Sequence, residues 1–207
     1  FTAFPSRDVA KSLVQVLCPR KQLYAAESEK FSHVTYFFNG GYAKHFCDEK
    51  WVKIASPEVK NYADKPEMSA RELTDYVIGA ITSQEYEFIV VNYANLDMIG
   101  HTGDFVAAQK AVSTVDSEMD RMIKILTKHG GQAIITADHG NIEGMVDLEN
   151  GQPDTEHSTN SVPLIIINSW IKIPHKLPNG KLANVAPTIL KMMGIKKPKE
   201  MTVASLI

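Results

Sequence analysis

The sequence predicts an α/β fold in which a mostly parallel sheet is flanked by helices. Short apolar runs alternate along the chain with longer stretches whose apolar residues recur at helical spacing. The runs Phe88–Val91 and Ala133–Thr136 lack polar–apolar alternation, which is typical of strands buried on both faces of a parallel sheet. Ligands bind such sheets at the carboxyl ends of the strands, and Asp and His residues follow both runs.

The N-terminal part of the chain is predicted to contain one short helix and two strands. Val9–Leu17 is compatible with a short helix, whereas Tyr24–Ala26 and His33–Phe38 are rich in the residues that strands favour. Asn39–Gly41 would end the second strand in a turn. Residues 42–66 contain two prolines and little periodicity, so we expect an irregular segment there.

Two amphipathic helices are predicted in the middle of the chain. The Ser69–Glu72 stretch matches a capping box and opens a helix that ends near Ser83. Asp104 or Thr102 caps the next helix, and Gly130–Gly131 ends it. The apolar positions of this second helix step by three and four residues: Ala108, Val112, Val115, Met119, Met122 and Leu126.

The C-terminal part predicts one more strand and a closing helix. Pro163 precedes the strand Leu164–Ile167. Asn184 would cap the helix, Pro187 is tolerated in its first turn, and Gly194 ends it.

The amino-acid composition and net charge bear on the size of the domain, its binding partners and its compartment. The chain has 207 residues, of which 44% are hydrophobic, enough for one large domain. Its net charge of -2 does not favour nucleic acid or an anionic membrane surface, and its apolar runs are shorter than the roughly 20 residues of a membrane helix. Cys18 and Cys47 are too few for a disulfide framework, so we expect a reducing, cytoplasmic compartment.

The stretch Asn92–Gly103 follows one strand and holds two residues of metal-ligand type. Asp97 and His101 stand four residues apart, which places them on one helical turn. Gly100 and Gly103 allow the backbone to approach closely. Alone, the pair also fits a helix N-terminus with a surface histidine.

Further ligand types follow the next strand. Asp138 and His139 are adjacent, and Gly140 supplies the turn that two neighbouring ligands require. The alternative is an Asx-turn that closes the strand. His157 lies in the following loop, where a lone histidine is usually solvated, and His33 is given that solvated interpretation, as are His45, His129 and His175.

Mixed carboxylate and imidazole ligands suit Mn²⁺, Zn²⁺ or Co²⁺ better than Ca²⁺. Two such ions suit an in-line displacement at phosphorus, because they clamp the attacking and leaving oxygens. Lys30 could add positive charge for a phosphate, although a surface lysine is the simpler interpretation of this residue alone.

Six stretches in this order resemble the cofactor-independent phosphoglycerate mutases of the alkaline phosphatase superfamily, and the resemblance covers residues 20 to 207. The stretches are Glu27–Lys30, His33–Gly41, Pro66–Ser69, Asn92–Gly103, Thr136–Asn141 and His157–Pro163. An Asp-His-Gly triplet alone would indicate only the superfamily.

The resemblance implies an alkaline-phosphatase-like fold and an enzyme of glycolysis and gluconeogenesis. Its substrate would be phosphoglycerate, interconverted between the 3- and 2-phospho forms through a phosphoserine, without a requirement for 2,3-bisphosphoglycerate. It also implies two divalent ions, preferably Mn²⁺, with Co²⁺, Zn²⁺ or Mg²⁺ as alternatives, and a charge-neutralising role for Lys30. The implied ligands are Asp97, His101 and His157 for one ion, and Asp138 and His139 for part of the second.

Parts of such an enzyme are not found in this sequence. The family's nucleophilic serine lies in an Asn-Ser-Glu-Val-Gly-His stretch, which this sequence lacks, and Ser158 is the nearest substitute. We therefore expect residues 1–207 to be the C-terminal portion of the metal-binding phosphatase domain, with residues 1–20 as the link from a missing transferase domain. The chain alone would be inactive, because it lacks the transferase domain and the N-terminal segment of such an enzyme. Two alternatives are another phosphomutase or phosphodiesterase of the superfamily, and a non-catalytic metal-binding remnant.

Overall fold

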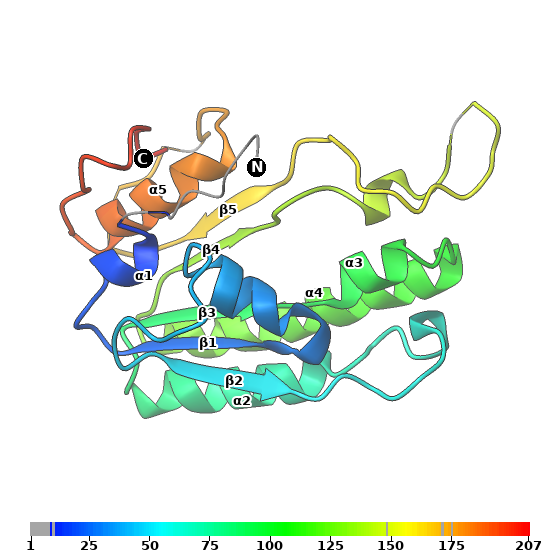
Figure 1. The fold of residues 1–207 in the computed structure, drawn as a ribbon, viewed down its shortest axis with the longest axis horizontal. Coiled ribbons are helices and arrows are strands. Elements are labelled where there is room, and N and C mark those ends of the chain that lie inside the picture. Colours follow the sequence, from blue (N-terminus) through cyan, green and yellow to red (C-terminus); the bar gives the residue numbers. More distant parts are fainter. Residues whose placement is uncertain (1–8, 10, 148, 171, 175) are drawn as a thin grey trace, which may run out of the picture.

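The computed structural model describes residues 9, 11–147, 149–170, 172–174 and 176–207 (Figure 1). Three strands form a parallel sheet in the order β2 (Lys50–Ile54), β1 (Gln22–Glu27) and β3 (Phe88–Asn92). β4 (Ala133–Thr136) and β5 (Leu164–Ile167) form an antiparallel pair. The predicted α/β class is confirmed, and the β4–β5 pair is the exception to its parallel arrangement.

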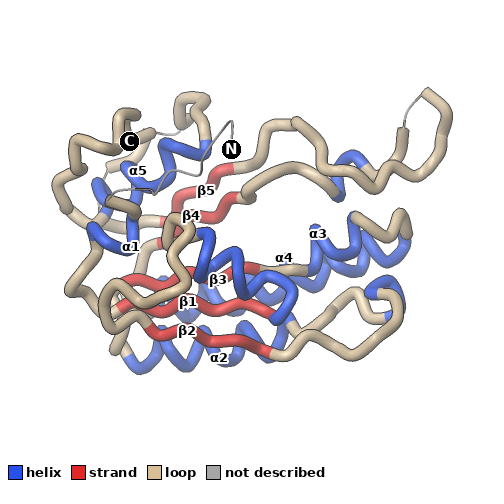
Figure 2. Tube along the Cα trace, viewed as in Figure 1, coloured by secondary structure: helices blue, strands red, loops and turns tan. Residues whose placement is uncertain are grey.

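Helices and single turns connect these strands (Figure 2). The α-helices are α1 (Leu13–Val16), α2 (Ala70–Ser83), α3 (Asn95–Gly100), α4 (Phe105–Lys128) and α5 (Val185–Met192). The shorter turns are η1 (Ser28–Lys30), η2 (His33–Phe37), η3 (Tyr62–Asp64), η4 (Ile142–Gly144) and η5 (Leu182–Asn184).

β1 is buried along its whole length, with helices packed on both faces. Successive side chains of a strand point to opposite faces, so its residues divide between two hydrophobic clusters. The cluster shared with α2 and α4 includes Leu23, Ala25, Leu73, Val77 and Met122. The cluster on the opposite face includes Tyr24, Ala26, Val14 and Val34.

The segment His33–Phe38 is helical, so the prediction of a strand there is wrong. It forms the π-helical turn η2, in which the Phe38 N–H donates to the His33 carbonyl at 3.2 Å. The turn buries Val34 and Thr35 while Phe37 is 61% exposed. Packing of Val34 against β1 therefore outweighs the strand preference of aromatic and β-branched residues.

Residues 42–66 contain β2, which the prediction of an irregular segment missed. Lys50 and Lys53 are exposed while Val52 is buried, as expected of an edge strand. β2 has only five residues, two of them lysines, so its polar–apolar alternation is too short to distinguish a strand from a loop in the sequence.

Of the three predicted helix caps, one is confirmed and two are not. Asp104 caps α4 by accepting the Ala107 N–H at 2.9 Å. Ser69 does not form the predicted capping box, because its hydroxyl donates to the Ala55 carbonyl at 2.7 Å and its N–H donates to the Glu27 carboxylate at 3.0 Å. Asn184 precedes α5, but its side chain bonds to other backbone groups.

Cys18 and Cys47 are paired in a disulfide, which the sequence did not lead us to expect. Their Cα atoms are 5.9 Å apart although 29 positions separate them along the chain. The bond joins the segment after α1 to the loop before β2.

Among the described residues, no helix is long and apolar enough to cross a membrane.

Candidate metal centre

The ends of three strands bring the predicted ligands to one edge of the fold. Two residues separate the end of β3 from α3, which carries Asp97, with His101 at its C-terminal end. Asp138 and His139 follow β4, and His157 precedes β5. Because β5 runs antiparallel to β4, its amino end lies beside the carboxyl end of β4, so a loop that enters β5 reaches the same edge as one that leaves β4.

Three ligand atoms converge from two of these segments. The Asp97 Oδ1 atom lies 3.2 Å from His101 Nε2 and 3.2 Å from His157 Nε2, and the two Nε2 atoms are 3.1 Å apart. Ligand bonds of about 2.0–2.2 Å place neighbouring ligand atoms about 3 Å apart around one ion. The donors therefore have the spacing and the chemistry of one coordination shell.

The orientation of His101 also suits a ligand. Its Nδ1 atom lies 2.7 Å from the Thr155 carbonyl oxygen, which can only accept a hydrogen bond. Nδ1 therefore carries the proton, and the lone pair of Nε2 faces Asp97 and His157. Backbone carbonyls commonly orient metal-binding histidines in this way.

His139 extends the cluster toward the loop after β4. Ligand atoms of Asp97, His139 and His157 all lie within 4.8 Å of one another. The His139 ring stacks on that of His157, with the centroids 3.7 Å apart. Asp138 lies beside them, with Oδ2 3.7 Å from His139 Nε2, and its side chain is 61% exposed.

Lys30 lies against the second oxygen of Asp97. Its Nζ donates to Asp97 Oδ2, and both side chains are largely buried. Burial raises the pKa of Asp97, but Lys30 and Asn141 outweigh burial and bring the value down to about 2. The Asp97 carboxylate is therefore ionised at neutral pH, as a metal ligand must be. The interpretation of Lys30 as a plain surface lysine is wrong.

His33 is close to these charges, so its interpretation as a solvated histidine is also wrong. Its Nδ1 atom is buried and has no hydrogen-bond partner among the described residues. Burial and the charge of Lys30 lower its pKa, while Asp138 and Asp97 act in the opposite direction. His45 and His129 bond to backbone carbonyls away from this cluster, and His175 lies outside the described residues.

Glu143 joins the two sides of the connection between β4 and β5, which carry His139 and His157, and no motif in the sequence identified it. Its carboxylate accepts the Asn141 N–H at 2.9 Å and the Asn160 amide at 3.1 Å, and it contacts the Ser158 hydroxyl. The Ser158 bond and these other donors lower the pKa of Glu143 to about 2. The Ser158 hydroxyl, considered from the sequence as a nucleophile, is a donor to Glu143.

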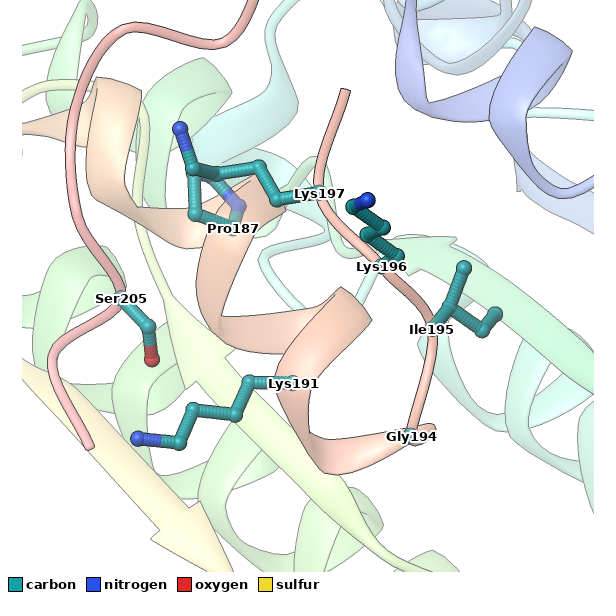
Figure 3. Close-up of a pocket in the computed structure, with 7 residues that line it drawn as sticks. All are labelled: Pro187, Lys191, Gly194, Ile195, Lys196, Lys197 and Ser205. Atoms are coloured by element: carbon teal, nitrogen blue, oxygen red, sulfur yellow. The ribbon is translucent and has the colours of Figure 1, made fainter. Parts of the chain in front are cut away.

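Two hollows lie in the described surface, and one of them borders this cluster. One of about 350 Å³ adjoins Asp138 and His139 and is lined by hydroxyl and amide side chains of residues 158–161. The other lies beside α5, away from the ligands, and three lysines line it (Figure 3). Two of these ammonium groups already donate to carbonyls, Lys191 to Ile207 and Lys197 to Met201.

Comparison with known proteins places the chain in a family. The profile of the metalloenzyme superfamily matches residues 6–197. The chain belongs to the metalloenzyme superfamily. Membership and the converging donors together support binding of a divalent metal ion at this edge.

Relatives within the superfamily are phosphoglycerate mutases, in agreement with the resemblance found in the sequence. The chain is 51% identical to 2,3-bisphosphoglycerate-independent phosphoglycerate mutase 2 of Methanosarcina barkeri, covering 99% of this chain and 39% of that protein. It is 47% identical to the 2,3-bisphosphoglycerate-independent mutase of Clostridioides difficile, covering 99% and 41%. The chain thus spans about two fifths of the length of these relatives.

A solved structure gives the same fold. A crystal structure of Leishmania mexicana phosphoglycerate mutase at low cobalt concentration superposes with a TM-score of 0.85. The two chains are 31% identical, and the match covers 93% of this chain and 38% of that one. The alkaline-phosphatase-like architecture expected from the sequence is confirmed.

Proposed function

We propose that this chain is the C-terminal portion of the metal-binding phosphatase domain of a cofactor-independent phosphoglycerate mutase. Such an enzyme interconverts 3-phosphoglycerate and 2-phosphoglycerate by way of a phosphoserine. The observation that carries the proposal is the convergence of Asp97, His101 and His157 beside Lys30, in a chain that is 51% identical to such a mutase.

The residues divide between two ion sites. Asp97, His101 and His157 would hold one divalent ion, and Asp138 and His139 would supply part of the shell of a second. Mn²⁺ suits this donor set, although Co²⁺, Zn²⁺ and Mg²⁺ remain alternatives. Bound ions would act as Lewis acids on phosphoryl oxygens.

Lys30 contributes in two ways. It holds Asp97 Oδ2, which leaves Oδ1 to face the two imidazoles. Its ammonium also adds a fixed positive charge at the edge where a phosphoryl group would lie, and fixed charges stabilise the negative oxygens of a transferring phosphoryl group.

The remaining groups would come from other parts of the longer enzyme. No serine in this sequence stands in the family's nucleophile motif, and the second shell is partial. Within the described residues, β3 pairs only with β1 and β4 pairs only with β5, so each has an edge on which a further strand can pair. We expect a segment of the longer protein, together with a transferase domain, to complete the site.

Calorimetric titration of Mn²⁺ into this chain, with mutase assays on the same sample, tests the proposal. We expect one tightly bound ion, a second weak one and no turnover. Asp97→Ala and His101→Ala should weaken the tight site, whereas His129→Ala should not, because His129 bonds to the Ile125 carbonyl at the end of α4. Equal affinity in all three variants would refute the ligand assignment, and turnover by the chain alone would refute an external nucleophile.

A further inference from the structure

Asn141 contacts both ligands that α3 contributes. Its Nδ2 atom lies 2.8 Å from Asp97 Oδ1 and 3.3 Å from the Asp97 carbonyl oxygen, so it donates to this residue twice. The same nitrogen is 3.4 Å from His101 Nε2. Asn141 is 5% exposed, so water competes little for these contacts.

The contact joins segments that are distant along the chain. Asn141 stands two residues after His139 in the loop that follows β4, whereas Asp97 lies on α3 after β3. Met145, four residues further along the same connection, packs with Ile99 of α3 in one hydrophobic cluster. The amide therefore links the ligands of one ion site to the loop that carries those of the other.

Gly100 makes room for this amide. A Cβ atom at Gly100 would lie 2.2 Å from Asn141 Oδ1 and 2.6 Å from its Cγ, well inside van der Waals contact. The buried Oδ1 atom has no hydrogen-bond partner among the described residues. The side chain is thus held by its donor contacts, and the absence of a side chain on α3 lets them form.

We propose that Asn141 is a positioning residue of the metal centre. A carboxylate oxygen has two lone pairs. Asn141 engages Asp97 Oδ1 along one of them and leaves the other for an ion, while Lys30 holds Oδ2. The carboxylate is therefore fixed at both oxygens before an ion arrives. This inference rests on the proposed ligand role of Asp97 and His101.

The test compares Asn141→Ala and Asn141→Asp with Asn95→Ala in the full chain. Asp is isosteric with Asn, but its carboxylate cannot donate and it repels Asp97. Asn95 is a matched control, because it is a buried asparagine on α3 whose amide donates to the Pro66 carbonyl at 2.8 Å and is not among the partners of Asp97 or His101. Mn²⁺ affinity by calorimetry and the visible absorption spectrum with Co²⁺ are the readouts, and circular dichroism verifies the fold of each variant.

We expect both Asn141 variants to bind Mn²⁺ about 10–100-fold more weakly, as for other outer-shell partners of metal ligands. Their Co²⁺ spectra should differ from that of the parent chain, whereas Asn95→Ala should retain the parent spectrum and affinity. Gly100→Ala should resemble Asn141→Ala, and the double variant should lose less than the sum of the two single losses.

Two failures are distinguishable. If the parent chain binds no Mn²⁺, the proposed metal site itself is wrong. If the parent chain binds Mn²⁺ but Asn141→Asp binds it equally well or better, Asn141 does not position the ligands. Equal losses in Asn141→Ala and Asn95→Ala would likewise overturn the inference, since they would show a general effect on packing.

Discussion

Glu27, at the carboxyl end of β1, should make the stability of the fold depend on pH. Its side chain is fully buried, one carboxylate oxygen accepts the Ser69 N–H at 3.0 Å, and the other has no hydrogen-bond partner among the described residues. Burial raises its pKa from 4.5 to about 7, against the opposing effects of the Ser69 N–H and the nearby Ser56 hydroxyl and with added repulsion from Glu72 and Glu29. Ionising Glu27 therefore costs the folded state free energy.

The sign and size of this pH dependence follow from the linkage between proton binding and folding. The folded state holds the proton more tightly than the unfolded state, so this contribution to stability is complete below pH 4.5 and is lost as pH rises through about 7. A shift of that size, at about 1.4 kcal/mol per unit, corresponds to a loss of about 3 kcal/mol. Glu27→Gln cannot ionise but keeps an oxygen for the Ser69 N–H, so it should escape this loss.

Urea unfolding between pH 5 and pH 8, in the presence of a chelator, measures the effect. The free energies of unfolding of the parent chain and of Glu27→Gln should diverge as pH rises, and the variant should be more stable by about 3 kcal/mol at pH 8. The exposed Glu58→Gln is the control and should run parallel to the parent chain. Parallel curves for Glu27→Gln, or a parent chain that gains stability with pH relative to it, would refute the reasoning.

Three further predictions concern the metal centre and the core. Gly140→Ala should weaken Mn²⁺ binding at least about tenfold in calorimetry. The added Cβ atom would lie 2.2 Å from Glu143 Oε1 and from Ser158 Oγ, so it would displace the loop that carries His157. Unchanged affinity would show that the loop adapts. Mn²⁺ affinity should fall on acidification below about pH 6, since ligand imidazoles must be neutral; a flat titration series would exclude histidine ligands. Leu73→Ala, at a fully buried position, should lower the free energy of unfolding by about 2–5 kcal/mol in urea, and a loss below that range would mean that the core closes over the cavity.

Short sequence patterns were sufficient to predict β4, β5 and the cap of α4. The bounds of β4 and β5 follow from apolar runs, and the Asp104 cap follows from an acidic residue placed just before a periodic stretch. The turn at His33–Phe37 and the edge strand Lys50–Ile54 required tertiary information, because packing against β1 decides both.

The candidate site shows the same division. Asp97, His101 and the Asp138–His139 pair stand in recognisable motifs, so the sequence indicated them. Asn141 stands in the same motif, but its contact with Asp97 depends on how two loops meet. His33 was set aside because a single histidine carries no spacing signal, and only the fold brings it toward Asp138 and Asp97.

The antiparallel direction of β5 has a consequence for the connection between it and β4. That connection runs out past α3 and returns (Figure 1), leaving with His139 and coming back with His157. The Gly140–Ser158 bridge closes its base, next to the stacked rings of the two histidines. An ion bound by Asp97, His101 and His157 would tie the returning side of this long hairpin to α3. Metal loading should therefore protect the backbone amides at the base of this hairpin from hydrogen exchange.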